Sequence, residues 1–300
     1  MKISVLTPTY NREELLINVY DSLVQNAKSE VEVEWLVMDD GSTDNTADRI
    51  KQFEQENKIQ ICYFRQENQG KMAAINQLVE KATGDVIIEC DSDDYFTPDA
   101  FQIIQQEWER NKERKDVYAL CFLKYDTKGN NMGNNFKKQE TTMFDLYFKE
   151  GETGEKALVF FGKIRKQYSY VLEKKERFST EARMHHKMDE SYKIIGINQP
   201  IMICEYQEDG YTQNIKKQFK ENPYGYYEYF KEILQKDLKG VSWSKRWYVI
   251  KHYILFSFLT KQYNGKVIKG IENKICYYLF LLPGIIKTKI KMGRIRKVKI

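Results

Sequence analysis

The sequence predicts an α/β fold in which a mainly parallel β-sheet with flanking helices precedes a helical C-terminal region. Over the first 125 residues, strand-like apolar runs alternate with helical patterns, and polar, acidic segments follow several of the runs. Strands at this spacing with helices between them form βαβ units, which build a Rossmann-like parallel sheet. The alternation stops near residue 125, which indicates that the rest of the chain is organised differently.

Each predicted element of the first part has its own pattern. Short apolar runs predict strands at 2–7, 33–38, 59–64, 85–90 and 117–123. Apolar residues at helical spacing predict helices at 13–27, 46–56, 71–82 and 98–111. Asn11 can cap the first of these helices, and Thr97, Pro98 and Asp99 have the composition of a helix start.

The remainder of the chain predicts a less regular order. Strand-like runs occur at 157–164, 168–172, 192–197 and 201–207, and a helical pattern occurs at 178–189. The segment ENPYG at 221–225 separates this part from a helix-rich tail. We therefore predict a domain at 1–215 and a basic, aromatic-rich, amphipathic helical region at 216–300.

Cysteine usage and the N-terminal residues predict a cytoplasmic protein. The five cysteines are scattered, odd in number and without a CxxC pair. This pattern favours a reducing compartment and argues against a zinc site or a disulfide framework. The first residues enter a strand-like run at once and lack the apolar segment of a signal peptide.

The last sixty residues differ from the rest in charge. Residues 241–300 contain fourteen Lys or Arg and one acid, Glu272, a net charge of +13, so the first 240 residues carry −8. Two apolar runs, 248–259 and 275–286, are too short or interrupted to span a bilayer, which takes about 20 apolar residues. Basic residues among Tyr, Phe and Leu favour a helix on the anionic inner face of the cell membrane. The alternative is a helical subdomain that packs on the main domain or mediates homo-oligomer assembly.

Polar loops follow the first, second and fourth predicted strands: TPTYNRE, DDGSTDNT and DSDDYFTPD. In a parallel sheet these loops share one edge, where such sheets bind ligands. Neither GxxxxGK(S/T) nor GxGxxG is present, so a bound nucleotide must be held in another way. Tyr10 can stack on a base, and Asp40 can accept a hydrogen bond from a base N–H.

Three carboxylates, Asp91, Asp93 and Asp94, crowd behind the fourth strand. Adjacent carboxylates repel, so they require a solvated turn or a cation. Two acids spaced two residues apart can share a divalent ion with phosphate oxygens and water. The sequence therefore predicts Mn²⁺ or Mg²⁺ at Asp91 and Asp93, where it would also hold the diphosphate of a nucleotide.

Four segments, in this order, resemble the inverting family 2 glycosyltransferases of the GT-A fold: TPTYNRE, VMDDGSTDNT, ENQGKMAAIN and DVIIECDSDD. The resemblance continues faintly through FSTEAR and YQEDGYT, as in enzymes that build bacterial capsule, teichoic acid or other surface glycans. It implies that Pro8 and Tyr10 line the nucleobase pocket and that Asp40 contacts the base. It also implies that Asn68 and Lys71 lie near the uracil or the diphosphate.

The resemblance further implies a DxD motif formed by Asp91, Ser92 and Asp93, in which Asp91 and Ser92 bind the nucleotide and Asp93 is the principal metal contact. The chain departs from the family at one position. Many relatives have Arg in a GxxxARN pattern, whereas this chain has Ile75 there. Lys71 can supply the missing positive charge.

Inverting transfer requires a carboxylate that deprotonates the acceptor hydroxyl while this hydroxyl attacks the anomeric carbon opposite the leaving diphosphate. The family places this acid at the start of a helix after the sheet, often in a Glu-Asp pair. Glu181 falls where the second acid of that pair would lie, and Thr180 departs from the pattern. Alternatively, Glu181 only complements the helix dipole, and Glu176 or Asp189 is the base.

The sequence thus predicts metal-dependent transfer of a sugar from a nucleotide-sugar, most readily a UDP-sugar, to a hydroxyl of a bacterial surface glycan, free or lipid-linked. No nucleic acid is expected as a partner. A nucleotidyltransferase would bring a Gly-rich basic loop near the first strand, which TPTYNRE is not. Intact Asp91, Asp93 and Glu181 argue against a catalytically silent glycan- or protein-binding module. His185 and His186 would point apart on a helix and are expected on the surface or in packing.

Overall fold

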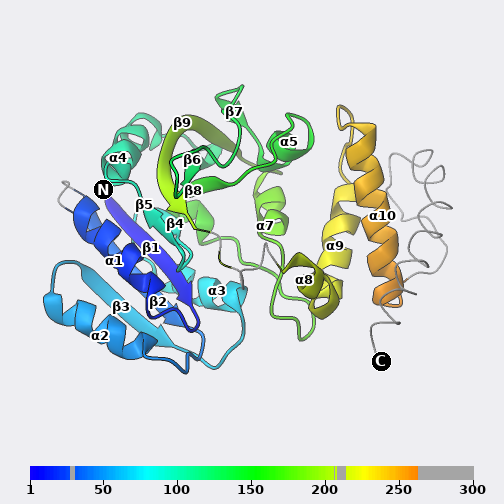
Figure 1. Cartoon of the computed structure of the whole chain (residues 1–300). Coiled ribbons are helices and arrows are strands. Elements are labelled where there is room, and N and C mark those ends of the chain that lie inside the picture. Colours follow the sequence, from blue (N-terminus) through cyan, green and yellow to red (C-terminus); the bar gives the residue numbers. More distant parts are fainter. Residues whose placement is uncertain (28–30, 206, 208–213, 263–300) are drawn as a thin grey trace. The chain divides into compact units, whose positions relative to one another are not determined.

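The structure is a computed structural model that describes residues 1–27, 31–205, 207 and 214–262. The chain divides into two compact units. The first contains Met1–Val171 and Met184–Gln213, and the second contains Leu172–Arg183 and Asn214–Ile300. Figure 1 shows the elements of both. The division of the chain into domains at 1–215 and 216–300 remains our interpretation, and residues 172–183 belong to the second unit.

The first half of unit 1 alternates strands and helices as predicted. Its strands are β1 (Lys2–Thr9), β2 (Glu32–Asp39), β3 (Gln60–Arg65) and β4 (Val86–Glu89). Its helices are α1 (Leu15–Asn26), α2 (Thr46–Glu56), α3 (Lys71–Lys81) and α4 (Ala100–Asn111). The four strands are parallel, in the order β3-β2-β1-β4. Apolar side chains of α1, α2 and α4 share one core with one face of β1 and β2, and α3 also packs against these two strands.

The second half of unit 1 makes the sheet mixed. It contributes β5 (Asp94–Phe96), β6 (Val117–Asp126), β7 (Glu140–Thr141), β8 (Lys156–Phe161) and β9 (Lys193–Cys204). The helices here are α5 (Met143–Phe148), α6 (Gly162–Arg165) and α7 (Glu181–Met188), the last of which spans the division between the units. Among the described residues, the strand order is β3-β2-β1-β4-β8-β6-β9-β5, with β7 beside β9. Because β8 runs antiparallel between β4 and β6, the run of adjacent parallel strands from β3 ends at β4, although β6 and β9 again pair parallel.

Several predicted boundaries in this half are wrong. The predicted strands at 192–197 and 201–207 are replaced by one long strand, β9, and β5 was not predicted. The predicted strand at 168–172 does not form, because the N–H and C=O of Tyr170 bond to the side-chain amide of Asn76 instead of to a strand. The cap predictions also fail: α1 begins after Glu14, and α4 begins after Asp99 without a side-chain cap.

The described part of unit 2 that follows residue 213 is mainly helical. It contains α8 (Ile215–Glu221), α9 (Pro223–Leu234) and α10 (Trp243–Leu259). Aromatic rings join α9 to α10, with Tyr227 stacked on Tyr253 and Tyr226 on Phe256. Most of the apolar run at 248–259 is therefore buried in this unit, whereas the run at 275–286 lies outside the described residues. Within the described residues, no helix is long and apolar enough to cross a membrane.

The strand register places the three polar loops at one edge of the sheet, as predicted. Thr9 lies opposite Asp39 in the β1–β2 pair, and Leu6 lies opposite Glu89 in the β1–β4 pair. Hydrogen bonding continues one residue past the ends of β2 and β4, because the N–H of Asp40 donates to Thr9 and that of Cys90 donates to Leu6. The loops after β1, β2 and β4 therefore start side by side.

Candidate active site

The loops after β1 and β2 are tied together by hydrogen bonds. Asn11 adopts a left-handed conformation (φ 53°), its N–H donates to Ser42 Oγ over 2.9 Å, and its Oδ1 accepts from the N–H of Thr43 over 2.8 Å. This linkage fixes the main chain beside Tyr10, a residue that is 45% exposed. An exposed aromatic ring on a constrained loop suits stacking on a base. Pro8 is buried at the end of β1.

Asp40 holds the loop between β3 and α3. Its carboxylate is buried and accepts hydrogen bonds from Gln66 Nε2 (2.7 Å) and from the N–H groups of Gln69 (2.7 Å) and Gly70 (2.8 Å). A carboxylate has about four acceptor positions, so these three bonds leave capacity for a contact with a base. The predicted base contact remains a prediction. Asn68 lies in the same loop, partly buried.

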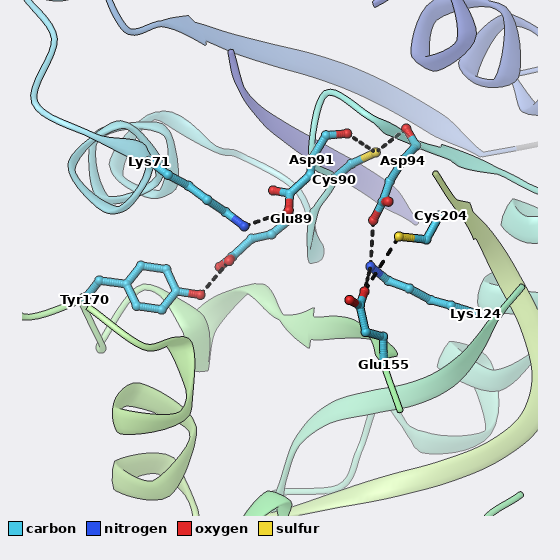
Figure 2. A network of polar contacts seen from close by, with 9 residues as sticks. All are labelled: Lys71, Glu89, Cys90, Asp91, Asp94, Lys124, Glu155, Tyr170 and Cys204. Carbon is cyan, nitrogen blue, oxygen red and sulfur yellow. Dashed lines mark hydrogen bonds and ion pairs between the residues drawn. The ribbon is translucent and has the colours of Figure 1, made fainter. Parts of the chain in front are cut away.

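The three acids after β4 have different partners, and Figure 2 shows two of them, Asp91 and Asp94. Lys71 Nζ lies 2.7 Å from Asp91 Oδ2 and approaches it from α3, whereas Lys124 Nζ lies 2.6 Å from Asp94 Oδ2 and approaches it from β6. Within the part of the chain that the structure describes, no cation pairs with Asp93. Burial and the neighbouring charges of Asp91 and Asp94 raise the pKa of Asp93 to about 6. Asp93 is therefore the carboxylate whose charge still requires compensation.

Lys124 and Glu155 are support residues that the sequence reasoning missed. Lys124 also lies 3.5 Å from Glu155, whose carboxylate accepts from Cys204 Sγ over 3.7 Å (Figure 2). Burial opposes the charge on Lys124, but Asp94 and Glu155 outweigh it and raise the pKa of the ammonium group. Lys124 directly follows the apolar run at 117–123, and a lysine at that position is the signal that could have identified it.

A second group of contacts ties α3 to the end of β4. Glu89 accepts from Arg165 Nε over 2.8 Å and from the Tyr170 hydroxyl over 2.6 Å. Asn76 of α3 exchanges two hydrogen bonds with the main chain of Tyr170, at 2.9 and 2.8 Å. Tyr170 therefore links the helix that carries Lys71 to the strand that precedes the DxD motif.

Ile75 is fully buried, so α3 presents an apolar core residue where many relatives carry Arg. Lys71 lies one helical turn earlier and provides the only positive charge in the first two turns of α3. Its ammonium group contacts Asp91, which places a cation beside the DxD motif by another route. That Lys71 replaces the missing arginine and contacts a diphosphate remains a prediction.

The three candidates for the general base have different surroundings. Glu181 is the first residue of α7 and is partly exposed. Glu176 accepts from the first free main-chain N–H groups of α9, at 2.6 and 2.7 Å. Asp189 accepts from the Tyr118 hydroxyl and from two N–H groups at the start of α5. Glu176 and Asp189 thus hold the starts of helices, and the role of Glu181 as the base remains a prediction.

The two histidines of α7 are buried against aromatic rings, which confirms the packing alternative. His185 lies beside Phe160, and His186 contacts Phe144 edge-on. Among the described residues, no group of three or more His, Cys, Asp and Glu side chains is arranged to hold a metal by itself. Asp91 and Asp93 nevertheless fit a cation that completes its coordination with phosphate oxygens, because Mg²⁺-type sites use one or two carboxylates plus phosphate.

Comparison with protein families identifies the chain. The model of the family "Glycosyl transferase family 2" matches residues 4–169, which include all four loop motifs and the Asp91–Asp93 site. The chain belongs to glycosyltransferase family 2. The family region ends just before Tyr170 and covers most of unit 1.

Curated relatives of this transferase match mainly over the same region. An uncharacterised glycosyltransferase of Mycoplasma genitalium is 33% identical over 132 residues, 42% of this chain and 44% of the relative. The poly(ribitol-phosphate) β-glucosyltransferase of Bacillus spizizenii is 35% identical over 125 residues, 41% of this chain and 19% of the relative. The chondroitin synthase of Escherichia coli is 30% identical over 138 residues, 45% of this chain and 19% of the relative. This chain therefore spans less than half the length of these relatives.

Solved structures confirm the predicted GT-A fold of this transferase. S. aureus TarS 1–349 in complex with UDP-GlcNAc matches with a TM-score of 0.59 and 19% identity, over 95% of this chain and 81% of that one. The mannosyltransferase PcManGT from Pyrobaculum calidifontis, in complex with GDP-Man and Mn²⁺, matches with a TM-score of 0.56 and 14% identity, over 97% and 84%. At these identities the likeness shows the fold alone.

Proposed function

We propose that this transferase moves a sugar from a UDP-sugar to a hydroxyl of a bacterial surface glycan, with inversion at the anomeric carbon and with Mn²⁺ or Mg²⁺ at the DxD motif. The observation that carries the proposal is the sheet edge at which Tyr10, Asp40 and the acids after β4 meet. The family match and the UDP-GlcNAc complex of TarS support it. Nucleotidyl transfer receives no such support.

The donor is held by groups from three loops. Tyr10 stacks on the base above Pro8, while Asp40 fixes the loop that carries Asn68 and receives a base N–H. Lys71 faces the diphosphate from the start of α3. Each role fits the observed surroundings: an exposed ring, a carboxylate with spare acceptor capacity and an ammonium group beside the acids.

The three acids after β4 have different roles. Asp91 and Asp93 hold the cation, and the main chain at Ser92 sets their spacing. A divalent cation, when bound, offsets the charge that develops on the leaving diphosphate. Asp94 supports the motif and does not bind the cation, because its carboxylate is buried and paired with Lys124.

Glu181 acts as the general base. Its carboxylate takes the proton of the acceptor hydroxyl as the hydroxyl oxygen forms a bond to the anomeric carbon. The bond from that carbon to the diphosphate breaks, and its electron pair leaves with UDP. Attack from the face opposite the leaving group inverts the anomeric configuration.

The proposal is tested by measuring UDP release from a panel of UDP-sugars, with GDP-mannose as a control, in Mn²⁺ and in EDTA. We expect release from at least one UDP-sugar in Mn²⁺ and its loss in EDTA. Release of pyrophosphate from a nucleoside triphosphate and a sugar phosphate would instead identify a nucleotidyltransferase. A protein that binds a glycan but neither UDP nor a UDP-sugar would be a binding module.

The proposed acceptor and location are based on the positive charge of the C-terminal residues. The basic C-terminal residues favour attachment to an anionic membrane surface on the cytoplasmic side, where a lipid-linked glycan acceptor would be presented. Residues 263–300 alone contain ten Lys or Arg and one acid. A truncation after Gln262 removes this charge and keeps α10, which packs on α9.

We expect full-length protein to sediment with anionic liposomes at low salt and to be partly released at high salt, since salt screens charge. The truncated protein should remain in the supernatant and still bind UDP. If full-length protein ignores liposomes and forms a stable oligomer that the truncation loses, the C-terminal residues mediate assembly instead.

A further inference from the structure

Lys71 occupies an unusual position for a cation. It is the first residue of α3, directly after the helix N-cap Gly70. The positive end of the helix dipole lies there, so a lysine is disfavoured unless an anion compensates for it. In the nucleotide-free protein Asp91 is such an anion, 2.7 Å away. The sequence therefore places a positive charge where it depends on a negatively charged partner.

The ion pair of Lys71 differs from that of Lys124 in what it would cost to open. The Asp94 side chain is 4% exposed, so loss of Lys124 would leave a buried charge unpaired, which proteins tolerate poorly. The Asp91 side chain is 39% exposed, and water can solvate it when Lys71 moves away. The Lys71–Asp91 pair can therefore exchange partners, whereas the Lys124–Asp94 pair is fixed.

The main chain around the pair is held in place. Tyr170 bonds to Glu89 at the end of β4 (Figure 2). Because Tyr170 also bonds to Asn76 of α3, the helix and the strand are linked on the side of Lys71. An exchange of partners by Lys71 therefore requires only rotation of side chains.

We propose that Lys71 is an exchangeable counter-ion of the DxD motif. In the nucleotide-free protein it neutralises Asp91, and in the donor complex Asp91 turns to the divalent cation while Lys71 turns to the diphosphate. The proposal rests on the proposed function, because it requires a nucleotide diphosphate and a divalent cation at this edge.

The exchange has a consequence for binding. Without nucleotide, Lys71 and a divalent cation compete for Asp91, which weakens binding of the free cation. With nucleotide, the diphosphate receives Lys71 and releases Asp91, so the same lysine favours the complex. Binding of the cation and of UDP is therefore positively coupled, and Lys71 is the source of part of the coupling.

The substitution Lys71→Met should change the two affinities in opposite directions. Mn²⁺ should bind the nucleotide-free variant about two- to fivefold more tightly, since a partly exposed ion pair no longer opposes it. UDP in the presence of Mn²⁺ should bind about ten- to a hundredfold more weakly, since a charged hydrogen bond to phosphate is lost. Mn²⁺ binding is followed by electron paramagnetic resonance and UDP binding by calorimetry.

Three further variants complete the experiment. Lys71→Arg keeps the charge and should leave free Mn²⁺ binding close to wild type. Lys81→Met removes the same charge from the exposed end of α3, about 15 Å along the helix, and should change neither affinity. Lys71→Gln replaces Lys71→Met in the comparison if the methionine variant folds poorly, as judged by circular dichroism.

The outcomes separate the two proposals. Weaker UDP binding with unchanged or weaker binding of free Mn²⁺ in the Lys71 variants would show that Lys71 only binds phosphate, and the exchange would be wrong. A wild-type protein that binds UDP equally in Mn²⁺ and in EDTA, or not at all, would overturn the proposed function itself.

Discussion

The two lysine–aspartate pairs beside the DxD motif have nearly the same length but different environments. Lys71–Asp91 spans 2.7 Å with a partly exposed carboxylate, and Lys124–Asp94 spans 2.6 Å with a buried one. Between them, Asp93 forms no ion pair among the described residues, and the nearby charge of Lys71 only partly offsets the effects that raise its pKa. The difference shows that contact distance does not assign a role. Burial separates an acid that can take part in binding from one that holds the strand.

The largest effect is expected at the acid between the pairs. Asp93→Asn should lower turnover by about 10³-fold or more, because loss of the cation removes several kcal/mol of transition-state stabilisation. UDP binding should weaken in Mn²⁺ and stay near wild type in EDTA, since the lost contribution is the ion bridge. Calorimetry in both conditions measures this. Equal UDP affinities of wild type and variant in Mn²⁺ would remove Asp93 from the metal site.

Glu181→Gln tests the chemistry apart from the two pairs. The amide keeps the shape of the side chain and removes the proton acceptor, and a positioned base contributes about 10²–10⁴-fold to rate. Turnover should fall by that factor with UDP affinity nearly unchanged. Glu176→Gln is the matched control, and we expect it to lower stability rather than turnover because Glu176 accepts two N–H groups of α9. Full turnover in Glu181→Gln would move the base elsewhere.

Prediction from sequence succeeded where local pattern and tertiary structure agree. Each of β1, β2 and β3 directly precedes a helix, and apolar periodicity placed every element from β1 to α3 to within about two residues. The edge that gathers the loops followed from parallel topology alone. Four segments of sequence predicted the DxD motif and the role of Lys71, which remain predictions.

The second half of unit 1 was predicted less well, because contacts between residues far apart in the sequence determine its structure. Tyr170 has a strand-like sequence around it, yet its main chain bonds to Asn76, a residue 94 positions earlier. β5 lies within the acidic turn and forms only because β9, about a hundred residues later, pairs with it. The roles of Lys124 and Glu155 likewise depend on contacts across the sheet, which no local pattern encodes.

Removing each lysine compares the two pairs directly. Lys124→Met should lower the free energy of unfolding by about 3–5 kcal/mol, since Asp94 would be left as an unpaired buried charge. Lys71→Met should change it by less than about 1 kcal/mol, because Asp91 can be hydrated. Urea denaturation measures both. Equal losses would mean that burial does not distinguish the pairs, and the assignment of Asp94 to a supporting role would lose its basis.

The smallest effect concerns the pH dependence of stability. Burial and neighbouring acids raise the pKa of Asp93 to about 6, above its value in the unfolded chain, so the folded state binds this proton more tightly. The stability that protonated Asp93 contributes is therefore complete below about pH 4 and is lost as pH rises through 6. The variant Asp93→Asn cannot ionise, so its free energy of unfolding relative to wild type should rise between pH 4 and 7 by about 1–2 kcal/mol. This figure lies below the full free energy of such a pKa shift, because Asp93 is partly exposed and solvent screens its charge.

Thermal unfolding of both proteins across this pH range, with EDTA and with Mn²⁺, sharpens the comparison further. In EDTA the free energy of unfolding of the variant should exceed that of wild type, and in Mn²⁺ this difference should shrink. The cation then supplies to Asp93 the counter-charge that Asp91 and Asp94 already receive from lysines. Glu67→Gln, which changes an exposed carboxyl group of the β3–α3 loop, controls for the removal of one acid. A pH-independent difference between Asp93→Asn and wild type would show that Asp93 is already compensated in the folded protein, and Asp93 would then no longer differ from its two neighbours.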